Sequence, residues 1–387
     1  MCNSGNKKIA IVITGLSFGG AERVTSYLAN YFISQGREVY LISLTTGEKA
    51  YPLSDEIHIR EFKVSDSLSP LARYVSLIRL IRKELISINP SVVLGMMSYS
   101  GSLAALANIG LKTPFLISER NDPFTSTGFS EKEKKVLKFV YRHFVTKAVF
   151  QSEGAKSFYF TKQDPRGVVI PNPLYLEEMP PSRVAFNTSK RIVSAGRLNF
   201  QKNYILLIHA FAQVYKNHPQ YSLVIYGEGE EREALSQVIK DHGLEKSVFL
   251  PGIEKNLFGK FGEAEMFVLS SNFEGMPNAL IEAMAMGLPC ITTDYSDGRG
   301  NIVEDGRNGL IVPRMDVGRL ADAITSLIEN PEYAIKLGQE AARIREDLDS
   351  NVVCKQWLNA VESTEGGNDM HGKGDVNAIF NRTDSNV

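Results

Sequence analysis

Two glutamates that frame the start of one expected helix are the residues best suited to contact a polar ligand. Residues 270–289 read SSNFEGMPNALIEAMAMGLP, with Glu274 in a loop and Glu282 in the second turn of the following helix. Pro277 suits the first helical turn, and Gly287 suits the helix end. A carboxylate in an apolar helix is costly to bury unless it accepts hydrogen bonds. Glu282 is therefore a candidate for binding ribose-like hydroxyls, or it caps a neighbouring loop.

Two basic residues follow the first strand expected in the second half of the chain. Residues 194–203 read SAGRLNFQKN and place Arg197 and Lys202 between a strand and a helix. Two cations at such a position could neutralise a diphosphate. Basic loop residues are more often solvated surface, and this alternative stays open.

Glycines open the first expected helix, in the segment GLSFGGAER at residues 15–23. Gly19 and Gly20 would let backbone N–H groups and the positive helix end approach a phosphate or a sugar. They could equally serve only tight packing between strand and helix. The spacing matches neither GxGxxG nor GxxxxGK[ST], so the dinucleotide fingerprint and the P-loop are both absent.

Apolar runs of strand length alternate with amphipathic segments along most of the chain, which predicts an α/β fold with two doubly wound parallel sheets. We expect one Rossmann-like domain at residues 1–170 and another at 191–345, joined by residues 171–190 with their four prolines. A helix at residues 346–363 should pack back on the N-terminal domain. The tail at 364–387, rich in Gly, Asn and Asp, is expected to be disordered.

The expected strands were placed from apolar runs bounded by turn residues. They cover Lys8–Thr14, Glu38–Ser43, Ser91–Met97, Pro114–Ser118, Ala148–Gln151, Gly167–Ile170, Arg191–Ala195, Ser222–Tyr226, Val248–Leu250, Met266–Ser270 and Cys290–Thr293. Ligands of such sheets bind where the strands end, so the two domains should face a shared cleft.

Composition excludes several classes of protein. The chain has 387 residues, 43% of them hydrophobic, and 43 Lys and Arg residues against 44 Asp and Glu residues, a net charge of -1 that gives no global reason to bind nucleic acid. Three cysteines, Cys2, Cys290 and Cys354, exclude a disulfide scaffold and a thiolate zinc site. With neither a signal peptide nor a membrane span in view, we expect a cytoplasmic protein.

Together, the GlyGly turn, the Gly-Arg-x4-Lys segment and the E-x7-E spacing from Glu274 to Glu282 resemble the retaining glycosyltransferases of the GT-B fold, particularly family 4. The resemblance covers about residues 8–362, with each motif in the expected place. The segments GGAER, SERNDP and EGMPNALIEAMA most resemble those of the family members that assemble bacterial capsule, O-antigen or lipid-linked oligosaccharide.

The resemblance implies a role for each matched residue. Arg197 and Lys202 would hold the donor's diphosphate, Glu282 the ribose and Glu274 the donor sugar. Arg197, Lys202 and Glu274 are thus the expected catalytic set. The loop at residues 251–256 would hold the base by main-chain contacts. The implied donor-binding set is Gly19, Gly20, Gly196, Gly252, Glu274, Gly275, Met276, Pro277, Asn278 and Glu282.

Cations and a helix N-terminus can stabilise the charge that develops on a leaving diphosphate, which a metal would otherwise do. The chain has no Asp-x-Asp motif suited to holding a metal and a diphosphate together, and its six histidines are scattered. We therefore expect an enzyme that needs neither a metal nor another cofactor.

One position departs from the family pattern. Many relatives have a histidine after the strand that here precedes Ser118-Glu-Arg-Asn-Asp-Pro, and this chain has Arg120 there. Glu119, Arg120 and Asp122 could contact the donor sugar or the acceptor, although Asn-Asp-Pro is also a common turn. The residue that assists the acceptor hydroxyl therefore stays open. Retention of configuration without an obvious protein nucleophile fits a front-face mechanism. In it the acceptor attacks the face of the sugar from which the diphosphate leaves, and the leaving phosphate assists.

Two basic amphipathic segments, residues 71–83 and 132–144, could lie against anionic lipid. Helix faces that pack on their own sheet are the commoner explanation. Because the family often uses acceptors linked to polyprenyl diphosphate, we expect at most a loose, salt-sensitive attachment to the inner membrane.

The sequence thus predicts a retaining transferase that moves a hexose or N-acetylhexosamine from a nucleotide sugar, a UDP-sugar above all, to a lipid-linked or growing surface polysaccharide. A UDP-sugar epimerase of the same fold and a noncatalytic nucleotide-sugar-binding subunit are the alternatives. A nicotinamide oxidoreductase is the weakest candidate because the phosphate-binding fingerprint is absent.

Overall fold

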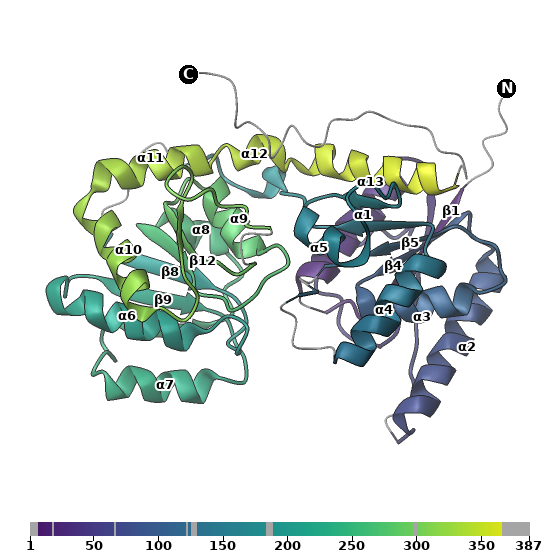
Figure 1. The fold of residues 1–387 in the computed structure, drawn as a ribbon, viewed down its shortest axis with the longest axis horizontal. Coiled ribbons are helices and arrows are strands. Elements are labelled where there is room, and N and C mark those ends of the chain that lie inside the picture. Colours follow the sequence, from purple (N-terminus) through teal and green to yellow (C-terminus); the bar gives the residue numbers. More distant parts are fainter. Residues whose placement is uncertain are drawn as a thin grey trace. The chain divides into compact units, whose positions relative to one another are not determined.

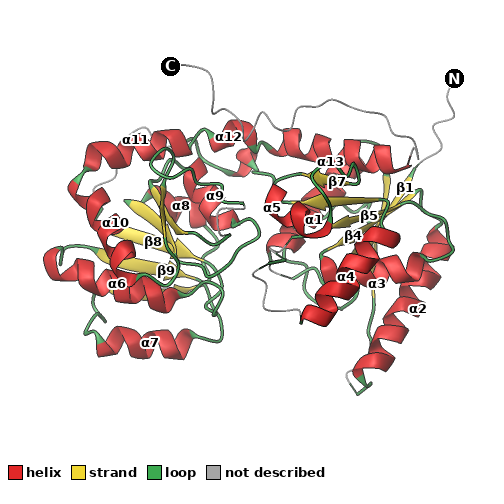
Figure 2. Ribbon diagram, viewed as in Figure 1, coloured by secondary structure: helices red, strands yellow, loops and turns green. Residues whose placement is uncertain are grey.

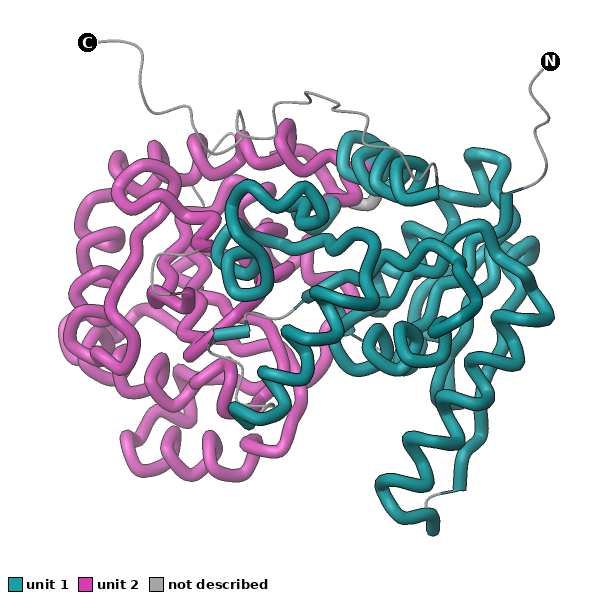
Figure 3. The backbone as a smooth tube through the Cα atoms, turned by 45° about the vertical axis from the view of Figure 1, so that its right-hand side comes forward, with its two compact units in different colours: residues 1–173, 351–387 teal, residues 174–350 magenta. Residues whose placement is uncertain are grey.

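The computed structural model describes residues 7–17, 19–65, 67–120, 123–124, 130–182, 189–296 and 300–365. Two compact units make up the chain (Figure 3). Unit 1 comprises Met1–Pro173 and Asn351–Val387, and unit 2 comprises Leu174–Ser350. The chain therefore passes from one unit to the other twice. Cys2, Asp122 and most of the tail expected at residues 364–387 lie outside the described residues.

Unit 1 is built on a seven-stranded sheet in the order β3-β2-β1-β4-β5-β6-β7. All its strand pairs are parallel, as predicted. The strands are β1 (Lys8–Ile13), β2 (Glu38–Ser43), β3 (His58–Glu61), β4 (Val92–Met96), β5 (Phe115–Ser118), β6 (Lys147–Phe150) and β7 (Gly167–Val169).

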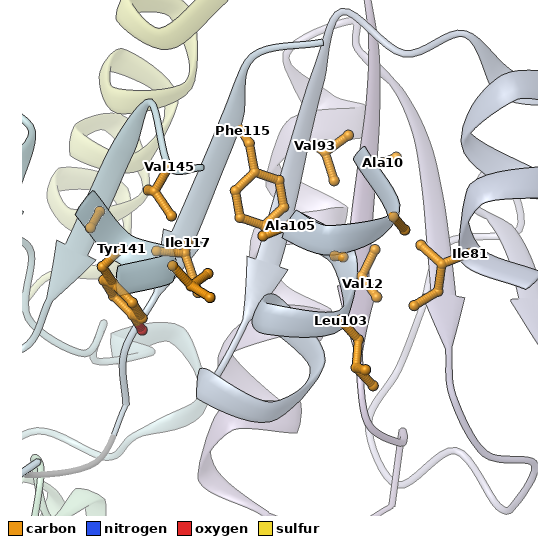
Figure 4. Close-up of a cluster of buried hydrophobic side chains, with 14 of the residues drawn as sticks. Ala10, Val12, Ile81, Val93, Leu103, Ala105, Phe115, Ile117, Tyr141 and Val145 are labelled. Carbon is orange, nitrogen blue, oxygen red and sulfur yellow. The ribbon is translucent and has the colours of Figure 1, made fainter. Parts of the chain in front are cut away.

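Helices cover both faces of this sheet, so alternate residues of a strand enter two different cores. Ala10 and Val12 of β1 pack toward α2 (Pro70–Ile88), α3 (Ser98–Asn108), α4 (Glu131–His143) and α5 (Glu153–Tyr159). Figure 4 shows part of this core, and Figure 1 shows α2, α3 and α4 along one face of the sheet. The other residues of β1 pack toward α1 (Gly20–Ser34) and α13 (Ser350–Glu365).

Helix α13, at the C-terminal end of the described chain, completes the second of these cores. Its Trp357 is fully buried among residues of β1, β4 and α1. At the end of the helix, Glu365 forms a buried ion pair with Arg37. These contacts explain why the residues that follow unit 2 belong to unit 1.

Unit 2 has a six-stranded sheet in the order β10-β9-β8-β11-β12-β13, again parallel throughout. Helices lie on both faces of it (Figure 2). The strands are β8 (Arg191–Ala195), β9 (Ser222–Tyr226), β10 (Val248–Gly252), β11 (Met266–Leu269), β12 (Cys290–Thr293) and β13 (Leu310–Val312). The helices are η1 (Leu176–Glu178), α6 (Tyr204–Asn217), α7 (Arg232–Asp241), α8 (Leu257–Gly262), α9 (Asn278–Ala285), α10 (Val317–Glu329), α11 (Pro331–Ala341) and α12 (Ile344–Asp347).

Strand order reverses between neighbouring strands in both sheets, at β1 and β4 in unit 1 and at β8 and β11 in unit 2. Helices α6 and α9 accordingly pack on opposite faces of the second sheet. The loops that follow β8 and β11 begin at this reversal, and open α/β sheets bind their ligands beyond such strand ends. The predicted fold class is confirmed.

Several elements differ from the predictions. Strands β3 and β13 were not predicted, because β3 (HIRE) is polar and mostly exposed and β13 has only three residues. Helix α9 begins at Asn278, so Pro277 caps it from outside instead of lying in its first turn. No helix in the described part of the chain combines the length and hydropathy of a membrane span.

Candidate functional site in the second unit

Lys202 and Glu274 meet where the strand order of unit 2 reverses. Lys202 lies in the loop between β8 and α6, and Glu274 lies in the loop between β11 and α9. The Lys202 Nζ atom is 2.6 Å from Glu274 Oε1, and the two side chains are only 15% and 7% exposed. The fold therefore joins two members of the predicted catalytic set, which are 72 residues apart in sequence.

The Glu274 carboxylate has further donors within unit 2. The Ser271 hydroxyl donates to Oε1 at 2.7 Å, and the Gln201 amide donates to Oε2 at 3.1 Å. The same Gln201 amide also donates to the Phe273 carbonyl at 3.1 Å. A carboxylate held by an ammonium, a hydroxyl and an amide can be buried in its charged form.

Asparagines connect the two loops that bear this pair. The Asn203 amide donates to Asn272 Oδ1 at 3.0 Å, and the Asn272 amide donates to the Phe200 carbonyl at 2.7 Å. The Ser270 hydroxyl donates to the Lys202 carbonyl at 2.8 Å. The two loops are thus fixed to each other over several residues, and the position of Lys202 does not depend on its ion pair alone.

Arg197, the other predicted diphosphate ligand, is exposed just beyond the end of β8. Among the described residues it has no ion-pair partner, whereas Lys202 is paired with Glu274. Gly196 precedes it with a φ of 155°, and a Cβ there would lie 2.8 Å from Lys202 Cε. The absence of a side chain at Gly196 therefore leaves space for Lys202.

The remaining predicted donor residues of unit 2 surround the start of α9. Gly275 and the buried Met276 and Pro277 lead into the helix, and Asn278 is its first residue. Glu282, in the second turn, is 8% exposed on an otherwise apolar helix. Glu274 and Glu282 thus lie on either side of the first turn of α9, as the E-x7-E spacing predicted.

A loop that sequence analysis missed packs against Gly196. Gly227 and Gly229 follow β9, and a Cβ on Gly227 would lie 1.9 Å from the Gly196 carbonyl oxygen. The Gly196 amide donates to the Tyr226 carbonyl at 2.9 Å, and the Gly227 amide donates to the Gly252 carbonyl at 2.8 Å. The loops after β8, β9 and β10 are therefore in contact. The G-E-G spacing directly after the strand at 222–226 was the signal that could have found it.

Two buried tyrosines lie near Glu274. Burial raises the pKa of Tyr204 and of Tyr295 well above the ordinary value, and the charge of Glu274 adds to both shifts. Both phenols therefore stay protonated near neutral pH and do not serve as bases beside Glu274.

The predicted residues of unit 1 lie in two places along the strand ends of its sheet. Gly19 immediately precedes α1 and Gly20 is its first residue, so both follow β1, where the strand order reverses. Glu119 and Arg120 follow β5 and are 2% and 7% exposed. Asp122 lies outside the described residues.

The side chain of Glu119 is used inside unit 1. Its Oε2 atom accepts hydrogen bonds from the hydroxyls of Ser98, Tyr141 and Tyr159, the last two at 3.2 and 3.1 Å. Burial, with the nearby Glu119 charge as a second cause, raises the pKa of both tyrosines well above the usual value, which keeps them as donors. Glu119 therefore joins α3, α4 and α5 to the end of β5.

No group of three or more His, Cys, Asp and Glu side chains in the described residues has an arrangement that could hold a metal ion. Cys290 and Cys354 are buried thiols in different units. The groups present at the ends of β8 and β11 are the exposed Arg197, the Lys202 ammonium held by Glu274, and the start of α9.

Two family models match the chain in succession. The model described as Glycosyltransferase Family 4 matches residues 18–178, and the model described as Glycosyl transferases group 1 matches residues 177–344. Together the two matches cover most of the chain, which identifies it as a glycosyltransferase similar to those of family 4. The predicted resemblance and the predicted enzyme class are both confirmed.

Relatives of this glycosyltransferase match over nearly their full length. A Campylobacter jejuni enzyme, GalNAc-alpha-(1->4)-GalNAc-alpha-(1->3)-diNAcBac-PP-undecaprenol alpha-1,4-N-acetyl-D-galactosaminyltransferase, is 26% identical over 92% of this chain and 98% of its own. The amylovoran biosynthesis glycosyltransferase AmsD of Erwinia amylovora is 26% identical over 90% of this chain and 98% of its own. The structure of Anabaena HepE in complex with UDP superposes with a TM-score of 0.75 at 18% identity, over 92% of this chain and 100% of that one, which supports the shared fold.

Substitution of Gly227 by alanine should destabilise unit 2. The new Cβ would meet the Gly196 carbonyl, and the φ of 143° is one that alanine rarely adopts. We expect the free energy of unfolding to fall by about 1–3 kcal/mol, as for other forced contacts. Urea denaturation followed by circular dichroism measures the change. Gly262→Ala, where nothing lies within 4 Å of the added Cβ, is the matched control, and equal stability of the two variants would contradict the close packing.

Proposed function

We propose that this glycosyltransferase moves a hexose or N-acetylhexosamine from a UDP-sugar to a lipid-linked or growing surface polysaccharide, with retention of configuration and without a metal. The observation that carries the proposal is the pairing of Lys202 with Glu274 at the strand-order reversal of unit 2. The names of the Campylobacter and Erwinia relatives support a glycan acceptor, and the UDP complex of HepE supports the donor.

In this proposal Arg197 and Lys202 bind the diphosphate of the donor. Arg197 is exposed at the end of β8. Lys202 lies in the same loop, and its ammonium group is already held in place by Glu274. As the bond from the sugar to the diphosphate breaks, negative charge grows on the leaving phosphate, and prepositioned cations stabilise that charge without reorganising. The N-terminus of α9, which follows Gly275 in the chain, adds its partial positive charge.

Glu282 and Glu274 take different parts of the donor in the same proposal. Glu282 accepts hydrogen bonds from the ribose, and Glu274 faces the sugar hydroxyls. When phosphate attracts Lys202, Glu274 still has Ser271 and Gln201 as donors, so its charge stays compensated. The loop at residues 251–256 holds the base, and Gly19 and Gly20 close over the diphosphate or the acceptor. Attack on the same face of the sugar, assisted by the leaving phosphate, accounts for retention without a protein nucleophile.

Measurements of nucleotide binding distinguish the proposed role of Glu282 from that of Glu274. We expect the wild-type enzyme to bind UDP in the presence of EDTA and to bind GDP and NAD more weakly. Glu282→Ala should weaken UDP binding by about tenfold or more, the low end for losing a hydrogen bond to a charged group. Glu274→Ala should keep UDP affinity and impair only the use of the intact donor. Isothermal titration calorimetry with each nucleotide measures these affinities.

Glu263→Ala, which removes an exposed carboxylate paired with Arg191, is the control for both variants. Normal UDP binding and normal turnover in both glutamate variants would contradict the assignment. A preference for GDP would change the donor and keep the transferase. Sugar conversion without an acceptor would favour the epimerase, and UDP binding without turnover would favour the noncatalytic subunit.

Measurements of turnover test the proposed role of Arg197. Arg197→Ala should lower kcat by roughly 10²–10³-fold, as when one prepositioned donor to a developing charge is removed. Release of UDP from a screen of UDP-sugars with lipid-linked acceptors provides the assay. Arg191→Ala removes the same group from the opposite end of β8 and should leave kcat unchanged. A loss of less than about threefold in a folded Arg197→Ala enzyme would be too small for that role.

We also propose that helix α4 holds the enzyme loosely against anionic lipid on the cytoplasmic face of the membrane. After its first turn the helix has no acidic residue, and its exposed side chains include Lys135, Val136, Phe139 and Arg142. Val136 and Phe139 are 62% and 54% exposed. An apolar strip between cations is the pattern that lies in a lipid interface.

Lipid vesicles test this surface. The enzyme should sediment with vesicles of phosphatidylcholine and phosphatidylglycerol at low salt, and not with phosphatidylcholine alone. Since each basic residue near such a surface contributes about 1 kcal/mol, a Lys135→Glu/Arg142→Glu variant should bind at least about tenfold less. Lys240→Glu/Lys246→Glu, on exposed positions of unit 2, is the control. Equal binding by the α4 variant and this control would contradict the proposal.

A further inference from the structure

We propose that Arg120 is a positioning residue that fastens both chain passages between the units to the end of β5. It follows the end of β5, and its side chain is only 7% exposed. Its contacts reach the segment that leaves unit 1 and the helix that returns to it. The inference goes beyond the proposed transfer reaction, which it needs only for its kinetic readout.

The outgoing passage is held through Asn172, which precedes the last residue of this segment of unit 1. The Arg120 Nη2 atom donates to Asn172 Oδ1, and the Gln151 amide donates to the same oxygen at 2.6 Å. Gln151 follows β6, the neighbour of β5 in the sheet. Asn172 is 4% exposed and Gln151 is 6% exposed, so loss of either donor would leave a buried oxygen with fewer hydrogen bonds.

The returning passage is held through Trp357 of α13. The Arg120 guanidinium carbon lies 5.9 Å from the centre of the Trp357 ring, within the range of a cation–π contact, and the indole is fully buried. One guanidinium thus contacts both the connection before unit 2 and the helix after it. A lysine could keep the charge in this place but could not reproduce the planar group that serves both partners.

The two passages are also joined to each other on the unit 2 side. The Leu174 amide donates to the Leu348 carbonyl at 2.7 Å, and the Ser350 amide donates to the Leu174 carbonyl at 2.9 Å. Leu174 and Asp349 thereby form an isolated parallel bridge. The amides of Leu174 and Ser350 therefore report how firmly the passages are held.

These contacts give Arg120 a mechanical role in catalysis. Units joined by two short passages are expected to move relative to each other, and residues at such joints set how the active conformation forms. With Arg120 in place, the unit 1 ends of both passages are fixed to one strand. Movement is then confined to the residues around the Leu174 bridge. Without it, nucleotide binding by unit 2 should persist, but the donor and the acceptor would be brought together less accurately.

Hydrogen exchange in the full-length enzyme, read by mass spectrometry, tests the fastening directly. In Arg120→Leu the amides of Leu174 and Ser350 should exchange at least about tenfold faster, the low end for losing a hydrogen bond from a charged donor. Amides of α1, which Arg120 does not fasten, should keep their rates. Arg120→Lys should restore part of the protection. UDP affinity should stay within about twofold, while kcat falls more than the donor KM changes.

Arg166→Leu is the matched control, since its guanidinium lies 4.9 Å from the Phe160 ring in the same unit and contacts neither passage. Unchanged exchange at Leu174 and Ser350 in folded Arg120→Leu would overturn the proposal. Equal acceleration of the α1 amides would overturn it as well, because Arg120 would then stabilise unit 1 as a whole. If the wild-type enzyme transferred no sugar, the proposed function would fail, and the exchange rates would still decide the role of Arg120.

Discussion

One buried ion pair, between Lys202 and Glu274, lies at the centre of the contacts between the loops after β8 and β11. Each residue ends up at the strand-order reversal because parallel strands place their carboxyl ends at one edge of the sheet. Removal of one member of a buried pair typically costs about 3–5 kcal/mol, since the other charge loses its partner. Here Ser271 and Gln201 also donate to the carboxylate. Glu274 would therefore lose less on separation from Lys202 than the carboxylate of an isolated pair would.

Most of the fold follows from local patterns that act over a few residues. Buried parallel strands are continuous apolar runs, and this made β1, β2 and β8 predictable almost to the residue. The same rule fails for an edge strand, which is why β3 was not predicted: its residues are polar, and its pairing with β2 is imposed by the neighbouring strand. Helix α3 has a weaker sequence pattern, because its small residues, SYSGSLAALAN, give little contrast between a buried and an exposed face.

The site was predictable where one segment contains the whole pattern and unpredictable where it depends on distant packing. The spacing of Glu274 and Glu282 lies within one loop and helix, so the sequence was sufficient. The contact between Gly227 and Gly196 joins loops after two strands, and the G-E-G spacing after β9 indicates a tight turn without indicating its partner. Glu119 and Arg120 illustrate the same limit, because the sequence gives no sign that their side chains bind Tyr159 and Asn172 of the same unit. Their contacts with a sugar or an acceptor stay a prediction.

The core of unit 1 contains residues that precede unit 2 in the sequence and residues that follow it, so the newly made chain cannot complete this core until unit 2 has been synthesised. Trp357 and its neighbours leave the ribosome only after residues 174–350 have been made, which takes on the order of 10–35 seconds at synthesis rates of about 5–20 residues per second. During that time the surface that α13 will cover on β1, β4 and α1 is left open, whereas unit 2 is one continuous segment with all its own strands. The half of the protein that is synthesised first is therefore the last to complete its folding, and a chain that stops early is left with an exposed apolar face that quality-control proteases can recognise.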